Sequence, residues 1–329
     1  MKKSLISAAI LASLGSLTLS GCFSSSSSST TAVTGTVVDW NITDATVCAD
    51  VNKNYICDAG EASTTSGADG KFTLNVPNDV TVYNLLAKGG TDTATNQAFN
   101  GVLAAPSTSQ YITPVSTLGV VYGSGALERV NSFYGTTFTS LDVNPIADAG
   151  LFRVSQQVAT MLSSMAEITS RVTNAGTLDG TAQEERYNFS LATKAFVNYL
   201  KTDTTGTNST QNYVSETLKN VASQLVTDTT STAYTNLQST LVTTSSTVYN
   251  AVNDVNAALV SYTPPTDSTI PTVVVSAQTT AADAANTADD SLPATFTAVT
   301  ITVPEDAVTV SGTSGTSGTS GTTTVSGAQ

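Results

Sequence analysis

The chain has 329 residues, of which 40% are hydrophobic, 11% charged and 6% aromatic, and its formal net charge is −13. Such an acidic chain repels phosphate backbones and attracts divalent cations, so nucleic acid is not an expected partner. The sequence contains no histidine, which removes the commonest general base and the commonest zinc ligand and argues against an enzyme.

The first 21 residues have the layout of a secretory signal peptide. Lys2 and Lys3 precede an apolar stretch, Leu5–Leu19, that is too short and too rich in Ser and Ala for a membrane-spanning helix. The stretch closes on Leu19-Ser20-Gly21-Cys22. We therefore expect residues 1–21 to be removed during export.

The Leu19–Cys22 tetrapeptide resembles the lipobox of bacterial lipoproteins. The resemblance implies cleavage before Cys22, a diacylglyceryl group on its sulfur and a further acyl chain on its amine. It also implies a lipid anchor in the outer membrane, facing the periplasm or the cell surface, because Phe23 stands where an inner-membrane retention signal usually has Asp. An ordinary secretory signal with a chance Cys is the alternative.

A segment rich in Ser and Thr follows the expected anchor. Ser24–Ser29 is an unbroken Ser run, and residues 22–33 as a whole have little apolar surface to bury. We expect them to form a flexible tether.

Residues 34–110 are expected to form a small β-sandwich-like module. Short segments that are rich in β-branched residues, or that alternate polar and apolar residues, are separated by turn signals, which is typical of such a module. The expected strands are Thr36–Val38, Ala45–Cys48, Lys71–Val76 and Val80–Leu86.

Oxygen-bearing side chains recur at regular positions between the second and third expected strands. They occupy positions 1, 3, 5, 9 and 12 of a twelve-residue segment and are Asp50, Asn52, Asn54, Asp58 and Glu61. This is the spacing of an EF-hand-type calcium loop, in which the seventh residue, here Ile56, supplies its carbonyl. We expect these six residues to hold a structural Ca²⁺. A polar turn that binds no ion is the alternative.

The sixth position of this loop departs from the pattern. It is Tyr55, where Gly normally makes a sharp turn, and a Tyr at positive φ is strained. The loop is therefore expected to bend differently from an EF-hand loop.

Two of the three cysteines lie beside the loop. Cys48 and Cys57 are nine positions apart, and a chain exported to an oxidising compartment is expected to join them in a disulfide. Two free buried thiols are the alternative.

The segment Gly35–Pro77 resembles the calcium-loop β-sandwich modules of bacterial surface proteins, akin to SdrD B-like and carboxypeptidase-regulatory-like repeats. The resemblance rests on Gly35-Thr36-Val37-Val38-Asp39, on the loop and on Ala68–Leu74. The stretches Gly89–Thr93 and Ile112–Leu118 resemble a continuation found in secreted bacterial proteins of unassigned activity. Together these resemblances imply a structural or display module that calcium stiffens and that carries no catalysis.

Residues 111–262 are predicted to form a bundle of four or five helices. Apolar residues there recur every three or four positions, which places them on one face of each helix. Such stripes include Val154, Val158, Met161, Met165, Ile168 and Val172, and a long one runs from Tyr234 to Leu259. The remaining residues, 263–329, are a low-complexity tail rich in Thr, Ser and Gly, with short strands expected at 272–275 and 297–303.

The sequence thus predicts an α+β multidomain protein: a β-sandwich with a calcium loop, a helical bundle and a tail. The expected function is that of a lipid-anchored structural or interaction protein of the cell envelope, for adhesion or surface display, with an envelope protein as partner. One alternative is a surface lipoprotein that binds a ligand such as a glycan, stacked on Trp40, Tyr55 and Tyr83. A hydrolase that uses two carboxylates about 5–9 Å apart is a further alternative.

Overall fold

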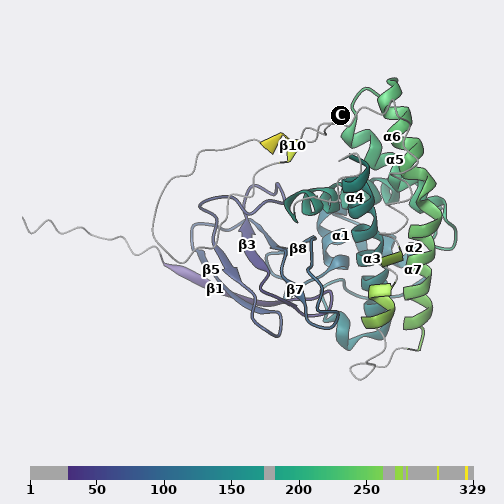
Figure 1. The fold of residues 1–329 in the computed structure, drawn as a ribbon. Coiled ribbons are helices and arrows are strands. Elements are labelled where there is room, and N and C mark those ends of the chain that lie inside the picture. The colour runs from purple at the N-terminus through teal and green to yellow at the C-terminus, as the bar shows by residue number, and fades with distance from the viewer. Residues whose placement is uncertain are drawn as a thin grey trace, which may run out of the picture.

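The computed structural model of the chain has small sheets in its N-terminal region and helices after them (Figure 1). It describes residues 29–173, 182–261, 271–276, 279–280, 302–303 and 323–324. The α+β composition predicted from the sequence is confirmed at this level. The expected signal peptide, the Cys22 anchor and residues 22–28 of the tether lie outside the described residues.

Nine strands of the N-terminal region form three small sheets. β4, β3, β6 and β8 form an antiparallel sheet in that order, β5 and β9 flank β1, and β2 pairs with β7. The strands are β1 Thr30–Val37, β2 Ile42–Thr43, β3 Thr46–Asp50, β4 Ser63–Thr65, β5 Lys71–Pro77, β6 Asn84–Lys88, β7 Thr91–Asp92, β8 Val102–Pro106 and β9 Tyr111–Ile112. A last pair, β10 Thr302–Val303 and β11 Thr323–Thr324, lies in the predicted tail.

Two strand boundaries differ from those predicted. β1 begins at Thr30, inside the predicted tether, because its β-branched residues pair with β5 in a register that starts at Thr30 and Pro77. The strand predicted from Val80 begins only at Asn84, where pairing with β3 starts. Val82 precedes that pairing and is exposed.

Between Pro114 and Leu259 the described residues form seven α-helices, where four or five were predicted. They are α1 Pro114–Tyr122, α2 Ala126–Tyr134, α3 Ala149–Thr173, α4 Ala182–Thr202, α5 Asn212–Leu225, α6 Thr232–Thr243 and α7 Ser245–Leu259, with a 3-10 helix η1 at Pro145–Ala147. The predicted apolar stripe from Val154 to Val172 is the buried face of α3. The long helix expected after Tyr234 is divided at Thr244, whose hydroxyl donates to the Leu241 carbonyl at 2.7 Å.

The prediction of a strand at 272–275 was wrong, because residues 271–276 are helical. Val274 is buried in a cluster with Phe152 of α3 and Val255 of α7. Packing against these helices therefore overrides the β propensity of three successive valines. Of the strand predicted at 297–303, only Thr302–Val303 falls in the described residues, and it is a strand there.

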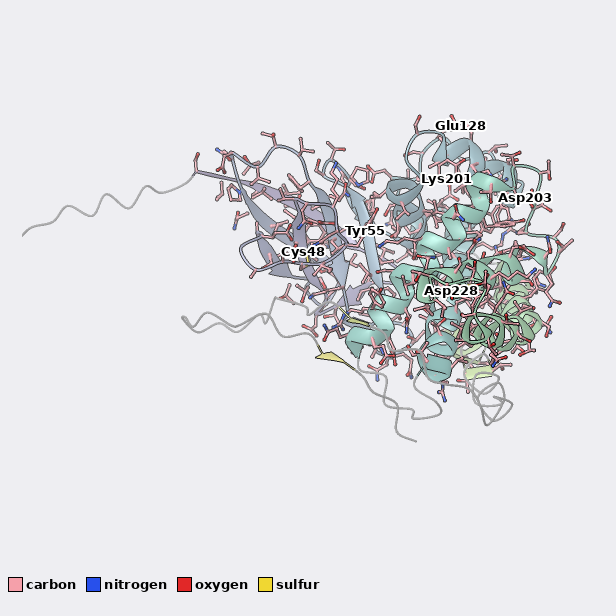
Figure 2. The ribbon with its side chains drawn as sticks, turned by 90° about the horizontal axis from the view of Figure 1, so that it is seen from above. Cys48, Tyr55, Glu128, Lys201, Asp203 and Asp228 are labelled. Atoms are coloured by element: carbon pink, nitrogen blue, oxygen red, sulfur yellow. A yellow bond between two sulfur atoms is a disulfide. The ribbon has the colours of Figure 1, made fainter. Side chains whose placement is uncertain are left out.

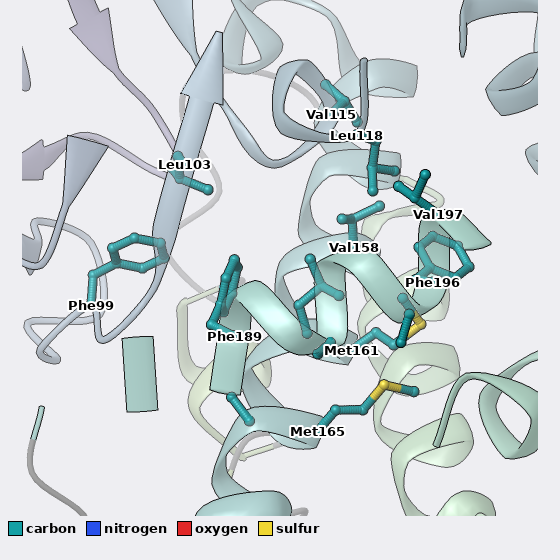
Figure 3. Packing of buried hydrophobic residues seen from close by; sticks show 14 of the residues in the cluster. Phe99, Leu103, Val115, Leu118, Val158, Met161, Met165, Phe189, Phe196 and Val197 are labelled. Carbon is teal, nitrogen blue, oxygen red and sulfur yellow. The ribbon is translucent and has the colours of Figure 1, made fainter. Parts of the chain in front are cut away.

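One hydrophobic core spans the strands and the helices, across the domain boundary predicted near residue 110. Figure 3 shows Phe99 and Leu103 from the strand region facing Phe189, Val158 and Met161 from the helices. The rings of Phe99 and Phe189 meet edge to face, with their centroids 6.0 Å apart. Met161 and Met165 are fully packed in this core, so they fill space as expected of methionine in an irregular interior.

The Ile112–Leu118 stretch joins the sheet to the helices. Thr113 and Ser116 form a reciprocal capping box, and Pro114 occupies the first turn of α1. The Ser116 hydroxyl donates to the Ala104 carbonyl at 2.8 Å, and the Thr117 hydroxyl accepts from the Ala104 N–H at 2.8 Å. Helix α1 thereby satisfies backbone groups of β8, the edge strand of the four-stranded sheet.

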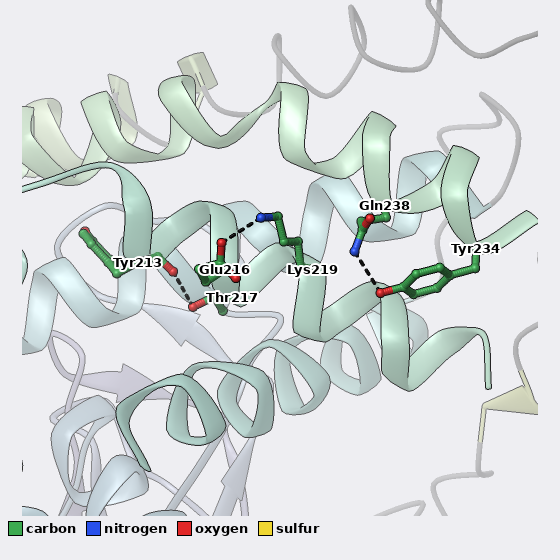
Figure 4. Close-up of polar contacts among 6 residues, drawn as sticks. All are labelled: Tyr213, Glu216, Thr217, Lys219, Tyr234 and Gln238. Atoms are coloured by element: carbon green, nitrogen blue, oxygen red, sulfur yellow. Dashed lines mark hydrogen bonds and ion pairs between the residues drawn. The ribbon is translucent and has the colours of Figure 1, made fainter. Parts of the chain in front are cut away.

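Aromatic rings join α2 to the later helices. Phe133 packs edge-on against Phe196 and Tyr213, with centroids 5.5 and 5.3 Å away. Tyr213 is buried, which raises the pKa of its hydroxyl well above the ordinary value. On the outer side of α5, Glu216 and Lys219 form a surface ion pair at 2.7 Å (Figure 4), which contributes little to stability.

A disulfide joins Cys48 in β3 to Cys57, as predicted. Their Cα atoms are 5.8 Å apart, and both residues are buried with Leu86, Val102 and Ala104 on one face of the four-stranded sheet. The bond fixes the segment that follows β3 to that sheet.

Phe133→Ala removes a ring that joins several helices, so we expect it to lower the free energy of unfolding by about 3–5 kcal/mol.

Strands and helices share one core, so they should unfold together in the parent and in the variant. The fluorescence of Trp40, the single tryptophan, and the far-ultraviolet circular dichroism should therefore change at the same urea concentration. Val82→Ala, at a side chain 61% exposed, is the control and should change stability by less than about 0.5 kcal/mol. Separate transitions for the two probes would contradict the shared core.

Replacing Cys48 and Cys57 together by Ser should lower the free energy of unfolding by about 2–3 kcal/mol, because the unfolded chain loses the constraint of a short closed loop. Urea unfolding of the parent and of the double variant measures the difference. Addition of a reductant should bring the parent to the stability of the double variant and leave the double variant unchanged. Equal stability of parent and double variant without reductant would rule out a stabilising disulfide.

Candidate metal-binding loop

The loop from Asp50 to Glu61 leaves the end of β3 and leads toward β4. Asp50 is fully buried, and its two carboxylate oxygens accept from the backbone N–H groups of Asn54 and Tyr55, each at 3.1 Å. The first acidic residue of the loop is therefore held in a fixed orientation at the base of the turn.

Glu61 closes the loop with both oxygens of its carboxylate. Oε1 accepts from the Val51 N–H at 2.7 Å, and Oε2 accepts from the Asp58 N–H at 3.0 Å. The last acidic residue thus binds backbone groups near both ends of the segment. This arrangement folds twelve residues back on themselves.

The two asparagines and Asp58 lie together between these acids. The side-chain amides of Asn52 and Asn54 donate to Asp58 Oδ2 at 2.7 and 2.8 Å. Their own carbonyl oxygens accept from backbone N–H groups two residues further on, Asn52 from Asn54 and Asn54 from Ile56. The structure therefore brings all five predicted oxygen-bearing side chains into one hydrogen-bonded loop.

Tyr55 adopts the backbone conformation that Gly takes at this position, with φ of 67°. The strained conformation that a Tyr was expected to resist at this position is therefore present in the loop. A left-handed conformation costs a side-chain-bearing residue about 1–2 kcal/mol. Two contacts of the ring offset that cost. The ring packs on the cluster around the disulfide, and the Lys194 ammonium lies over its face, 5.4 Å from the centroid.

The loop concentrates negative charge in a partly buried setting. Burial raises the pKa of Asp50 above its ordinary value of 3.8, and the charge of Glu61 adds to this, whereas the N–H groups of Tyr55 and Asn54 oppose it. A cation in the loop would relieve this unfavourable charge. Within the described part of the chain, no three His, Cys, Asp or Glu side chains converge as a metal centre, so ligation here depends on the Asn oxygens and on backbone carbonyls as well.

Other residues that the sequence singled out are not brought together. Trp40 meets Phe152 edge to face at 4.7 Å, Tyr55 packs beside the disulfide, and Tyr83 packs at the edge of the main core. Each ring is therefore engaged in a different cluster. Figure 2 shows Tyr55 and Cys48 in the strand region, away from the helix-side acids Asp203 and Asp228.

Sequence reasoning missed a second group of acids. Asp39, Asp92, Glu167 and Glu185 line one cavity of about 240 Å³ between the strand region and α3 and α4. Asp39 and Asp92 belong to segments that the sequence analysis used for its family resemblance, whereas Glu167 and Glu185 were given no role there. No spacing in the sequence connects residues that come from four separate segments.

Among the helices of the described residues, none is both long enough and apolar enough to cross a membrane. No family model matches the chain, and neither a curated protein nor a solved structure matches it.

Proposed function

We propose that this chain is a lipid-anchored structural or interaction protein of the bacterial envelope whose strand region is stiffened by Ca²⁺. The observation that carries the proposal is the convergence of Asp50, Asn52, Asn54, Asp58 and Glu61 in a single closed loop. Adhesion and surface display are the roles that fit such a module, with an envelope protein or a surface glycan as partner.

The residues of the loop fit the chemistry of Ca²⁺, which takes six to eight hard oxygens. Asp50 and Asp58 would each supply carboxylate oxygen, Ile56 its backbone carbonyl, and Glu61 both oxygens. Each Asn carbonyl oxygen accepts one backbone N–H, which leaves a lone pair for the metal. The ion would supply positive charge beside Asp50, whose charged form is disfavoured by burial and by the neighbouring charge of Glu61.

The position of the loop explains how Ca²⁺ would stiffen the molecule. The disulfide holds the middle of the loop to the sheet, and Tyr55 lies under Lys194 of α4. An ion that fixes the loop would therefore fix a contact between the strand region and the helices. At the millimolar Ca²⁺ found outside cells, even a weak site fills. We also propose that the β4-β3-β6-β8 sheet and the β5-β1-β9 sheet face each other as a β-sandwich.

The anchor supplies the other half of the proposal. A single acyl chain holds a protein to a membrane only marginally, whereas two or three chains make release slow. Acylation of Cys22 would place such an anchor eight positions ahead of Thr30, where β1 begins.

Ca²⁺ should raise the melting temperature of the mature chain by about 5–10 °C when the ion is about 100-fold above its dissociation constant. Glu61→Gln removes a charge and one ligand oxygen, so most of the rise should be lost. Asp79→Asn removes the same charge at an exposed turn and should keep the rise. Scanning calorimetry with Ca²⁺ and with chelator makes the measurement. An equal response in the parent and in Glu61→Gln would refute a site in this loop.

Cys22→Ser should move the protein from the membrane fraction to the soluble fraction of the cell envelope, because the sulfur that carries the lipid is gone. Cys48→Ser, which also removes one thiol, should remain in the membrane fraction. Mass spectrometry of native material should find an N-terminal Cys22 with two or three acyl chains. An unacylated N-terminus, or a retained leader, would refute the anchor.

A further inference from the structure

The four-acid cavity is separate from the Asp50–Glu61 loop. It has a volume of about 240 Å³ and lies between the β2–β7 pair and the helices α3 and α4. Its carboxylates are Asp39, Asp92, Glu167 and Glu185. The calcium proposal assigns no role to any of them.

The carboxylates on the strand side are fixed by hydrogen bonds. Asp39 and Asp92 are 7% and 6% exposed. Asp39 Oδ1 accepts from the Gln156 side-chain amide at 2.8 Å, and Asp92 Oδ1 accepts from the N–H groups of Ala94 and Thr95 at 2.8 and 2.9 Å. Burial and the neighbouring charge of Asp92 raise the pKa of Asp39 well above its ordinary value. Two acids are thus held close together with little water to separate them.

The helix side of the cavity carries a second pair of acids. Glu167 is paired with Arg171 at 2.7 Å. Burial raises the pKa of Glu185, with added repulsion from Glu167 and Glu184, whereas a hydrogen bond from Asn100 and the charge of Arg171 oppose the rise. Arg171, which is ion-paired with Glu167, thus also acts on Glu185.

A buried hydroxyl lines the same cavity. Ser164 is 2% exposed, and its Oγ has no hydrogen-bond partner among the described residues. A buried polar group without a partner costs stability unless a ligand or water satisfies it. Phe99 and Val274 add apolar surface to the cavity wall. The cavity thus combines separated negative charges with a free hydroxyl and an apolar wall.

The arrangement of charge selects the class of ligand. The acids of the cavity interact in two groups, because Asp39 is acted on by Asp92 of the strand region, whereas Glu185 is acted on by Glu167, Glu184 and Arg171 of the helices. We propose that this cavity binds a linear aliphatic diamine, with one ammonium at Asp92 and Asp39, the other at Glu185, and the methylene chain along Phe99. The ligand would offset the repulsion within each wall and bury its stem on apolar surface.

Isothermal titration of the mature chain with 1,5-diaminopentane should show saturable binding at one site. Pentylamine should bind at least about tenfold more weakly, because it lacks one of two charge-assisted contacts, and 1,5-pentanediol should give no heat. Equal binding of the diamine and the monoamine would show general attraction to an acidic surface. That result, or no binding of the diamine at millimolar concentration, would overturn the proposal.

Variants locate the site. Glu185→Gln should weaken diamine binding by about tenfold, and Glu167→Gln should weaken it too, because Arg171 would be released to pair with Glu185. Glu128→Gln, which removes the same charge from an exposed position on α2, should bind as the parent does. Parent-like binding by both Glu185→Gln and Glu167→Gln would exclude this cavity. Glu61→Gln should leave diamine binding unchanged, so failure of the calcium loop and failure of this site can be told apart.

Discussion

Strands and helices are buried in one continuous core, and this shared core determines where the acidic cavity and the Asp50–Glu61 loop lie. Leu103 from β8, Leu118 from α1 and Phe189 from α4 belong to the same buried cluster, and removal of such apolar surface from water is the main driving force for folding. The acidic cavity lies between the strand region and the helices because these parts pack on each other. The Asp50–Glu61 loop is likewise held by contacts from both, through the disulfide and through Lys194.

The loop shows how tertiary contacts decide a local conformation. A Tyr at the sixth position predicts strain, and by itself that residue argues against an EF-hand-like bend. The structure nevertheless places Tyr55 at positive φ, because its N–H binds Asp50 and its ring packs on both the sheet and α4. Gly at this position would remove the strain and would also remove the ring contact with α4. The loop thus accepts backbone strain at Tyr55 and gains a contact with Lys194 of α4.

Features encoded by local spacing were predicted well from the sequence. The disulfide and the stripe from Val154 to Val172 are each defined by short separations along the chain. Features that depend on packing between distant segments were not. Residues 271–276 are helical because Val274 packs on α3 and α7, and the acidic cavity joins segments as far apart as Asp39 and Glu185. Neither follows from propensity or periodicity alone.

With the proposed lipid on Cys22, the early start of β1 would limit the distance between the folded residues and a bilayer. Only Phe23–Ser29 separate Cys22 from Thr30, and eight residue steps span at most about 29 Å when fully stretched. The N-terminal end of β1, which pairs with the end of β5, would then lie within that distance of the lipid headgroups. In that arrangement the acylated protein would meet a partner only close to the membrane, through the residues of its folded part.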